Sequence, residues 1–462
     1  MVFSQAENII QATFRSAMRE AETQRKRETV RMLDYFHATQ TPYIQEQIAR
    51  ERQEPERYHP VFFNVVGKIV RGLSQVYLAD ATRDILNGTD QDKAIYAAIE
   101  TTAQLPAKMK QTNRFTTLCG NVLLRPVWRN GKMDLDVLTG DVLDVFYGDS
   151  PETLDAVMIT HDETGRADEV EYDLWTPETY SRLDSQGNTL KTEPNLYGVL
   201  PFVPVFSSPP TNEFWLQGAA DLMAVQDEVN RRLTNLSFTA DLQGFGVAVA
   251  KGITPGRDGK PPDLTFGPGN FLGLPEGADF NFAAPNAPIQ DILAMIDFLL
   301  KQAAITRGLT AASMATNTSQ ESGVARLAGN VELEEARRDQ IANFAGVEAK
   351  LFELFRIIWN VHNPHRQMSE AATLRVEFYD PKPVISPLEQ VQTWEKQLEL
   401  GLTTREDILI ELNPDLTRKE AEQRLEEIHA KNQKYGGNDH FGYTPSFDSF
   451  PNDNPNPSPN SA

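Results

Sequence analysis

The sequence predicts an α+β protein, because helical and extended patterns occupy different stretches of the chain. Apolar residues recur at helical spacing within residues 1–52, for instance at Ile9, Phe14 and Met18. Short runs of alternating polar and apolar residues fill the chain between about 120 and 205, and helical periodicity returns from residue 218. Blocks of strands and blocks of helices that do not alternate are typical of α+β folds.

Composition indicates a globular chain with excess negative charge. The 462 residues are 40% hydrophobic, enough for roughly two to four compact units. No run of about 18 apolar residues occurs and the N-terminus lacks signal-peptide features, so we predict no transmembrane helix and synthesis in the cytoplasm. A formal charge of −21 disfavours tight wrapping of nucleic acid, so any contact with DNA should be loose, local or sliding.

The first half of the chain is predicted to contain helices followed by an antiparallel meander. Residues 61–80 predict an apolar helix, and helical pattern continues in patches through Ala94–Asn113. The dipeptide Asn130-Gly131 between two alternating runs is a strong hairpin signal. Further strands are predicted at Asp144–Tyr147, Ala156–His161, Glu169–Trp175 and Thr179–Leu183.

The second half has an unusual order of elements. Residues 218–242 predict a helix, 244–286 a small β-rich insert dense in Gly and Pro, and Ile289–Thr306 another helix. A polar, small-residue loop at 308–320 leads into a very long helix over about 321–361. Thr318 with Glu321 fits a capping box for that helix, and Pro364 stops it. The remaining predictions are a strand at Thr373–Tyr379, short helices at Pro387–Leu400, Thr404–Leu412 and Thr417–Lys431, and a disordered tail from Asn432.

The glycine-rich stretches do not match phosphate- or dinucleotide-binding motifs. Residues 252–260 have the wrong spacing for a phosphate-binding loop, and Pro261 follows Lys260 where Ser or Thr is needed. Gly267, Gly269 and Gly273 miss the dinucleotide spacing by one residue, and a hairpin turn is the better interpretation. No Gly-x-Ser-x-Gly elbow is present.

Some side chains admit a chemical interpretation, but a structural one fits each better. Cys119, the only cysteine, has apolar neighbours typical of a core position rather than of a nucleophile. His362 and His365 could share a metal, but capping the end of the long helix fits better. Four aspartates could suggest a nuclease-like metal cluster: Asp134, Asp136, Asp141 and Asp144. A solvated hairpin face is the better interpretation, because no nearby His or Lys completes a metal cluster. The acidic balance of residues 386–431 is interpreted as a solvated helical face rather than a dedicated interaction site. We therefore predict no catalytic residue, no metal site and no cofactor.

The order of helix, β-insert, helix, small-residue loop and very long helix resembles the portal proteins of tailed bacteriophages. The segment LQGAADLMAVQDEVNRRLTN at 216–235 resembles the family's entry into its stem. SGVARLAGNVELEEARRD at 322–339 is similar to the start of its long helix. FFNVVGKIVRGLSQVYLAD at 62–80 resembles its N-terminal wing helix, and residues 401–428 resemble its crown helices. The resemblance covers about residues 28–430.

The resemblance implies a portal-like subunit with a mainly helical wing and crown, an antiparallel β meander in the wing, a two-helix stem and a small β-rich clip. Its segments would be the wing at 1–217, the first stem helix at 218–243, the clip at 244–286, the second stem helix at 287–307, the tunnel loop at 308–320, the long wing helix and strand at 321–384, the crown helices at 385–431 and a disordered tail at 432–462.

The resemblance also implies a structural protein rather than an enzyme. Such a protein forms a homo-oligomeric ring, a dodecamer in the assembled particle, at one capsid vertex, and double-stranded DNA slides through it during packaging and ejection. The large terminase and then the head–tail adaptor would dock on it. The major capsid and scaffolding proteins would be further partners, and no membrane is involved. The ring would be assembled in the host cytoplasm and reside in the virion.

Two groups of residues are expected to contact partners. The tunnel loop would form a soft, mostly neutral constriction near the DNA through Thr310, Ser313, Met314, Thr316 and Asn317; a surface loop without DNA contact is the alternative. On the clip, Lys251, Arg257 and Lys260 would bind acidic surfaces of the terminase and adaptor, and a solvated hairpin is the alternative there.

Two other functions stay open at this point. Another structural phage protein, such as an adaptor or minor capsid protein, is disfavoured by the size of the chain and by the clip-like insert. A metal-dependent enzyme acting on nucleic acid is disfavoured because no motif supports it.

Overall fold

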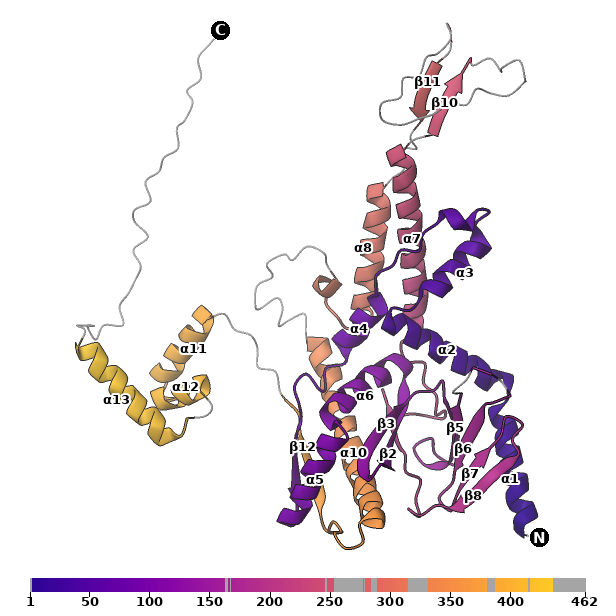
Figure 1. The fold of residues 1–462 in the computed structure, drawn as a ribbon. Coiled ribbons are helices and arrows are strands. Elements are labelled where there is room, and N and C mark those ends of the chain that lie inside the picture. Colours follow the sequence, from indigo (N-terminus) through magenta and orange to yellow (C-terminus); the bar gives the residue numbers. More distant parts are fainter. Residues whose placement is uncertain are drawn as a thin grey trace, which may run out of the picture. The chain divides into compact units, whose positions relative to one another are not determined.

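The structure is a computed structural model that describes residues 2–162, 165–166, 168–245, 247–252, 277, 279–283, 289–314, 331–379, 387–413 and 416–434. The chain forms two compact units, Met1–Lys382 and Pro383–Ala462. Helices and antiparallel sheets both build the first unit, which confirms the predicted α+β class (Figure 1). Within the described ranges, no helix combines the length and the apolar character needed to cross a bilayer.

The first unit begins with a run of helices. These are α1 (Val2–Ala17), α2 (Glu20–His37), α3 (Thr41–Glu51), the 3-10 turn η1 (Pro55–Arg57), α4 (Val65–Leu73), α5 (Asp90–Thr102) and α6 (Leu105–Cys119). The helix predicted over 61–80 is too long: it begins only after Asn64, whose side chain accepts a hydrogen bond from the Gly67 amide at 2.7 Å. It ends before Ser74, whose hydroxyl donates to the Val70 carbonyl at 2.7 Å.

Two sheets follow α6 rather than one continuous meander. The first has the order β3-β2-β9, formed by β2 (Asn121–Arg129), β3 (Lys132–Leu138) and β9 (Val203–Phe206). The predicted turn between β2 and β3 is confirmed, with positive φ at both Asn130 (53°) and Gly131 (75°). The second sheet is an antiparallel meander of β4 (Leu143–Tyr147), β5 (Leu154–His161), β6 (Glu171–Trp175), β7 (Thr179–Leu183) and β8 (Thr189–Pro194).

The helix–insert–helix order predicted for the second half is confirmed. The elements are α7 (Ala220–Phe245), the paired strands β10 (Val247–Lys251) and β11 (Asp279–Ala283), α8 (Ile289–Ile305), the 3-10 turn η2 (Ala311–Met314) and α10 (Val331–His362). α10 ends before Pro364, as predicted, whereas the first part of the predicted helix and the Thr318–Glu321 capping box lie outside the described residues. The predicted strand β12 (Thr373–Glu377) pairs with β1 (Thr82–Leu86), a strand that the sequence does not predict.

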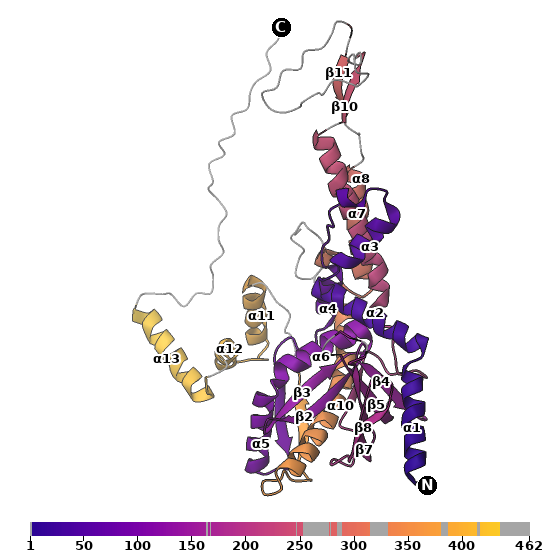
Figure 2. The same ribbon diagram turned by 45° about the vertical axis from the view of Figure 1, so that its right-hand side comes forward.

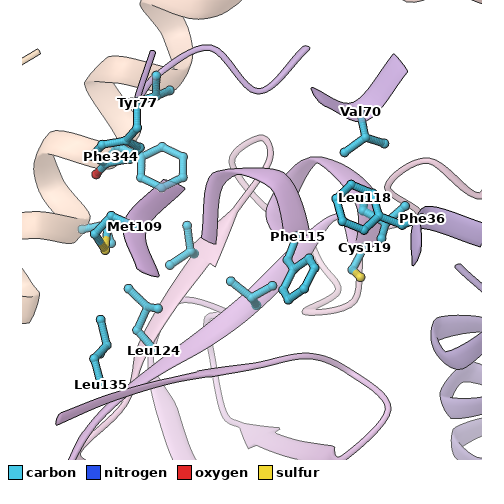
Figure 3. Close-up of a cluster of buried hydrophobic side chains, with 14 of the residues drawn as sticks. Phe36, Val70, Tyr77, Met109, Phe115, Leu118, Cys119, Leu124, Leu135 and Phe344 are labelled. Atoms are coloured by element: carbon cyan, nitrogen blue, oxygen red, sulfur yellow. The ribbon is translucent and has the colours of Figure 1, made fainter. Parts of the chain in front are cut away.

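The main core of the first unit lies where α10 packs against β2 and β9, where α6 packs against β2 and β3, and where α4 packs against α6. Phe344, Phe352 and Phe355 of α10 are fully buried, and each contributes roughly 2–3 kcal/mol by leaving water. Figure 3 shows Phe344 beside Tyr77 on one side of this cluster and Phe36, Val70, Leu118 and Cys119 on the other. The predicted core position of Cys119 is confirmed, and burial raises the pKa of its thiol far above the ordinary range.

In the described part of the second unit, three short helices lie at nearly the predicted positions. They are α11 (Pro387–Glu399), α12 (Arg405–Leu412) and α13 (Arg418–Lys434). Thr404 and Asp407 form a reciprocal capping box at the start of α12. The tail beyond Lys434 lies outside the described residues.

Candidate functional site

The base of α7 is fixed to α4 by a buried glutamine. The Gln226 side-chain oxygen accepts hydrogen bonds from the Val65 and Val66 amides at 2.9 and 3.2 Å. These amides lie in the first turn of α4, where no carbonyl of the helix itself can accept them. The Gln226 side-chain nitrogen donates to the Phe63 carbonyl at 2.8 Å and to Asn230 at 2.7 Å. Every polar atom of this side chain is therefore engaged, and α7 leaves the core in a fixed direction.

A second contact ties α7 to α2. Asp227 accepts hydrogen bonds from the Tyr35 hydroxyl and from the Arg31 guanidinium. Burial raises the pKa of Tyr35, and the hydrogen bond to Asp227 raises it further, so the phenol stays protonated and acts as the donor. The N-terminal half of α7 is thus held by polar contacts to α4 and to α2.

α8 runs beside α7, as the two views of Figures 1 and 2 agree, and buries only one of its faces. Ile296, Ala303 and Ala304 are buried within the chain. On the opposite face Met295, Phe298 and Ile305 remain 42%, 55% and 48% exposed. Their spacing of three and seven residues places them in one stripe along the helix. α8 therefore presents three apolar side chains that nothing in the described chain covers.

The β10–β11 hairpin follows α7 and carries one of the predicted partner-binding residues. Lys251 is exposed at the end of β10, directly opposite Asp279 in the register of the pair. Arg257 and Lys260 lie outside the described residues. Of the three basic residues predicted to bind partners, only Lys251 therefore has a described position.

The segment after α8 contains a 3-10 turn whose residues differ in exposure. Ser313 is exposed, and its hydroxyl donates to the Thr310 carbonyl at 2.6 Å. Thr310 is half-buried, and Met314 packs into the main core at 7% exposure. Thr316 and Asn317 lie outside the described residues. In the isolated chain Met314 is thus a core residue, whereas Ser313 faces solvent.

The four aspartates of the β2–β4 region are not a solvated face, contrary to that interpretation of the sequence. Asp144 is buried and lies 2.6 Å from Lys26, with the Arg25 guanidinium also nearby. Burial raises the pKa of its carboxyl although both cations oppose this. Asp141 accepts a hydrogen bond from the Thr139 hydroxyl.

Two of these aspartates instead join β3 to cations on neighbouring elements. Asp134 pairs with Lys108 of α6 and with Arg129, and Asp136 lies 2.7 Å from Arg125. A lysine therefore does stand beside the aspartates, and it acts as an ion-pair partner. Across the described residues, no three His, Cys, Asp or Glu side chains come together in a way that could hold a metal ion.

His362 does not cap α10, so that prediction is wrong. Its ring stacks on Trp128 of β2, with centroids 5.0 Å apart and planes 6° apart, and its Nε2 lies 3.2 Å from the Tyr197 hydroxyl. Asn363 closes the helix instead, because its side-chain amide donates to the Trp359 carbonyl at 3.0 Å. Burial lowers the pKa of His362. His365 is exposed.

Two polar clusters in the first unit escape sequence reasoning because their members are separated along the chain. The Arg83 guanidinium lies in the core, 2.7 Å from Glu348 of α10. On the second sheet, Asp173 lies 2.7 Å from His161 and accepts a hydrogen bond from Tyr180 at 2.8 Å. Neither cluster forms a recognisable motif.

One family model matches the chain. Residues 117–434 match the family described as "Phage portal protein, SPP1 Gp6-like". None of the curated proteins matches the chain.

Among solved structures, the chain is similar to a chain of "Virion of native gene transfer agent (GTA) particle", with 12% identity and a TM-score of 0.40 over 75% of this chain and 89% of that one. It is also similar to chains of the "Neck of empty GTA particle computed with C6 symmetry" and the "Neck of native GTA particle computed with C12 symmetry". For both neck chains the identity is 12% and the TM-score 0.44, covering 75% and 76% of this chain and 89% of each of those chains.

The family match covers the β3-β2-β9 sheet, the β4–β8 meander, the α7–α8 pair, the hairpin, α10 and the helices of the second unit, which is well over half of the chain. Portal proteins are structural proteins of the phage virion, not enzymes. This chain belongs to the phage portal protein family.

Proposed function

We propose that this protein is the subunit of a portal ring at one capsid vertex, through which double-stranded DNA is packaged and later ejected. Family membership supports the portal assignment. The exposed apolar stripe of α8, formed by Met295, Phe298 and Ile305, supports the ring. A helix in a finished assembly rarely leaves such a stripe in water, because its burial is favourable.

A ring covers this stripe through a contact between two different surfaces. The stripe of one subunit packs against a different face of its neighbour, and rotation about a central axis closes the set. Covering what remains exposed of the three side chains contributes about 1 kcal/mol for each of them. Every subunit has this contact on both sides, so the contribution is repeated around the ring, which we propose to be a dodecamer in the particle.

Electron microscopy of the purified protein tests the ring. We expect projections with a central hole for the unchanged chain. Phe298→Asp places a charge in the contact and should give monomers, whereas Thr306→Asp, an exposed residue just after α8, should leave rings intact. Equal far-UV circular dichroism of both variants shows that folding is retained. Rings formed equally well by Phe298→Asp would overturn the assigned contact, and monomers of the unchanged chain would overturn the ring.

In this proposal α7 and α8 are the stem, the β10–β11 hairpin belongs to the clip, and residues 308–320 are the tunnel loop. The remaining helices and sheets of the first unit form the wing, and the second unit forms the crown. The major capsid and scaffolding proteins surround the ring during assembly in the host cytoplasm. The net charge of −21 for each chain supports a conduit that does not hold DNA tightly.

We assign the DNA-facing side of the loop to Thr310 and Ser313, together with Thr316 and Asn317. Met314 belongs to this set only if it leaves the core, since its side chain is buried in the isolated chain. A photoreactive residue at position 313 should crosslink to DNA in packaged particles, and one at the exposed Thr101 of α5 should not. Absence of crosslinks from all positions between 308 and 320 would overturn this assignment.

The hairpin is the proposed docking site for the large terminase and then for the head–tail adaptor, through Lys251, Arg257 and Lys260. Lys251→Glu replaces attraction to an acidic partner by repulsion, so it should weaken terminase binding at least tenfold. The effect should be largest at low salt, where few ions screen the two charges. Lys132→Glu makes the same charge change on another exposed hairpin and is the matched control. Equal binding by the two variants would remove Lys251 from the docking site.

A further inference from the structure

The second unit has almost no core of its own. Among its described side chains, in 390–413 and 416–431, only Ala421 is buried. Its helices instead border an open apolar groove of about 430 Å³, lined by Val391, Trp394, Leu398, Ile408, Leu409 and Leu425, with Glu395 and Arg405 at its polar edge. This volume lies within the range of sites that bind small ligands or peptide side chains. The described part of the unit therefore leaves the apolar wall of this groove uncovered.

The groove wall is partly fixed in place. The Trp394 indole N–H donates to the Glu411 carboxylate at 3.1 Å, which joins α11 to α12. This hydrogen bond holds the half-buried indole at the wall of the groove. An aromatic side chain is a suitable occupant, because aromatic pairs contribute beyond the area that they bury.

The sequence that follows α13 supplies such side chains. Between residues 435 and 450 the chain contains Tyr435, Phe441, Tyr443, Phe447 and Phe450, whereas residues 451–462 contain no aromatic residue. The stretch 435–450 is therefore richer in aromatic residues than the chain as a whole, in which they make up 9%. A polar tail without a binding role has little reason to gather so many aromatic side chains in one stretch.

The length of the chain permits a return to the groove. From Lys434, the end of α13, back to Leu425 is a distance of about 14 Å along the helix. Phe441 is seven residues beyond Lys434, and an extended chain of that length reaches about 23 Å. Gly436 and Gly437 follow the helix end after one intervening residue, Tyr435, and glycine allows a chain to reverse.

Charge also fits this occupant. Asp448 is the single charged residue of 441–450, and Arg405 is the cation at the edge of the groove. The Arg405 guanidinium also lies 3.4 Å from Nε2 of His429. We propose that the groove of the second unit binds the aromatic segment 441–450 of the same chain. This inference rests on the second unit alone, so it stands or fails separately from the ring contact of α8.

Photocrosslinking in the full-length protein tests the contact directly. With p-benzoylphenylalanine in place of Phe447, we expect crosslinks to groove residues between 391 and 425, and none from the same probe in place of Ser458. Mixing isotopically heavy and light protein shows whether a crosslink joins one chain or two. Crosslinks outside the groove, or crosslinks that join two chains, overturn the proposal.

Hydrogen exchange provides a second measurement that needs no probe in the groove. We expect the amides of α11 and α12 to exchange at least tenfold faster than in the unchanged chain when three substitutions are combined: Phe441→Ser, Phe447→Ser and Phe450→Ser. The matched control replaces Asn452, Asn454 and Asn456 with Ser and should exchange at the unchanged rate. Equal exchange in both triple variants overturns the proposal, whatever the state of the ring.

Discussion

The buried ion pair between Arg83 of β1 and Glu348 of α10 should be among the most sensitive sites of the first unit. Both side chains are fully buried, at 0% exposure. The guanidinium donates to the two Glu348 oxygens at 2.7 and 3.1 Å, and the Tyr77 hydroxyl donates to the same carboxylate at 2.8 Å. Burial alone would lower the pKa of Arg83, but the hydrogen bonds and charge of Glu348 raise it. The guanidinium is therefore charged in the folded protein, and the Glu348 carboxylate is its closest buried partner.

Removal of one partner leaves the other as a buried charge without its main counter-ion. Glu348→Met should destabilise the fold by about 3–5 kcal/mol, and Arg83→Met by a similar amount. The double variant removes both charges and should cost far less than the sum, since Glu100, the other partner of Arg83, is 30% exposed and can be solvated. We expect a coupling free energy of at least about 2 kcal/mol.

Urea unfolding of the two single variants and the double variant measures this coupling. The series is best made in the Phe298→Asp background, so that ring assembly adds no concentration-dependent stability. The Arg182–Glu171 pair on the second sheet is the matched control. Its side chains are 41% and 38% exposed, and its coupling should be about 0.2–1 kcal/mol. A coupling below about 0.5 kcal/mol for Arg83 and Glu348 would refute the reasoning.

Three further predictions follow from the first unit. Burial lowers the pKa of His362, so the fold loses stability as pH falls below about 6.5; His362→Phe should reduce the drop in Tm between pH 7.5 and pH 5. Burial opposes ionisation of Asp173, but hydrogen bonds from His161 and Tyr180 outweigh it and lower the pKa of its carboxyl. Its stabilising contribution is therefore present above about pH 4 and lost in acid, and Asp173→Asn should flatten acid unfolding followed by circular dichroism. Gly218→Ala should lower Tm more than Gly131→Ala, although both glycines have positive φ, because only at Gly218 would a Cβ atom meet backbone atoms of Leu118 and Cys119.

Sequence reasoning succeeded where the signal is local. The 3.6-residue periodicity of α7, α8 and α10 and the turn chemistry of Asn130-Gly131 are set by neighbouring residues, so they can be read without the fold. The same local pattern gave too long a helix over 61–80, because apolar spacing does not reveal the Asn64 cap or the start of β1. The predicted loop at 308–320 is described only as far as Met314, and the burial of Met314 depends on a core assembled from distant segments.

The sequence by itself therefore determined the order of the elements, and with it the family to which the chain belongs. Only the tertiary structure decided that Arg83 meets Glu348, that Asp144 is buried beside Lys26 and that His362 stacks on Trp128. Each of these pairs joins residues more than a hundred positions apart, and a polar side chain carries no local mark of whether its partner will be water or another segment. The exposed stripe of α8 belongs to the same class, because a helix reveals its apolar residues in sequence but not which of them the subunit itself will cover.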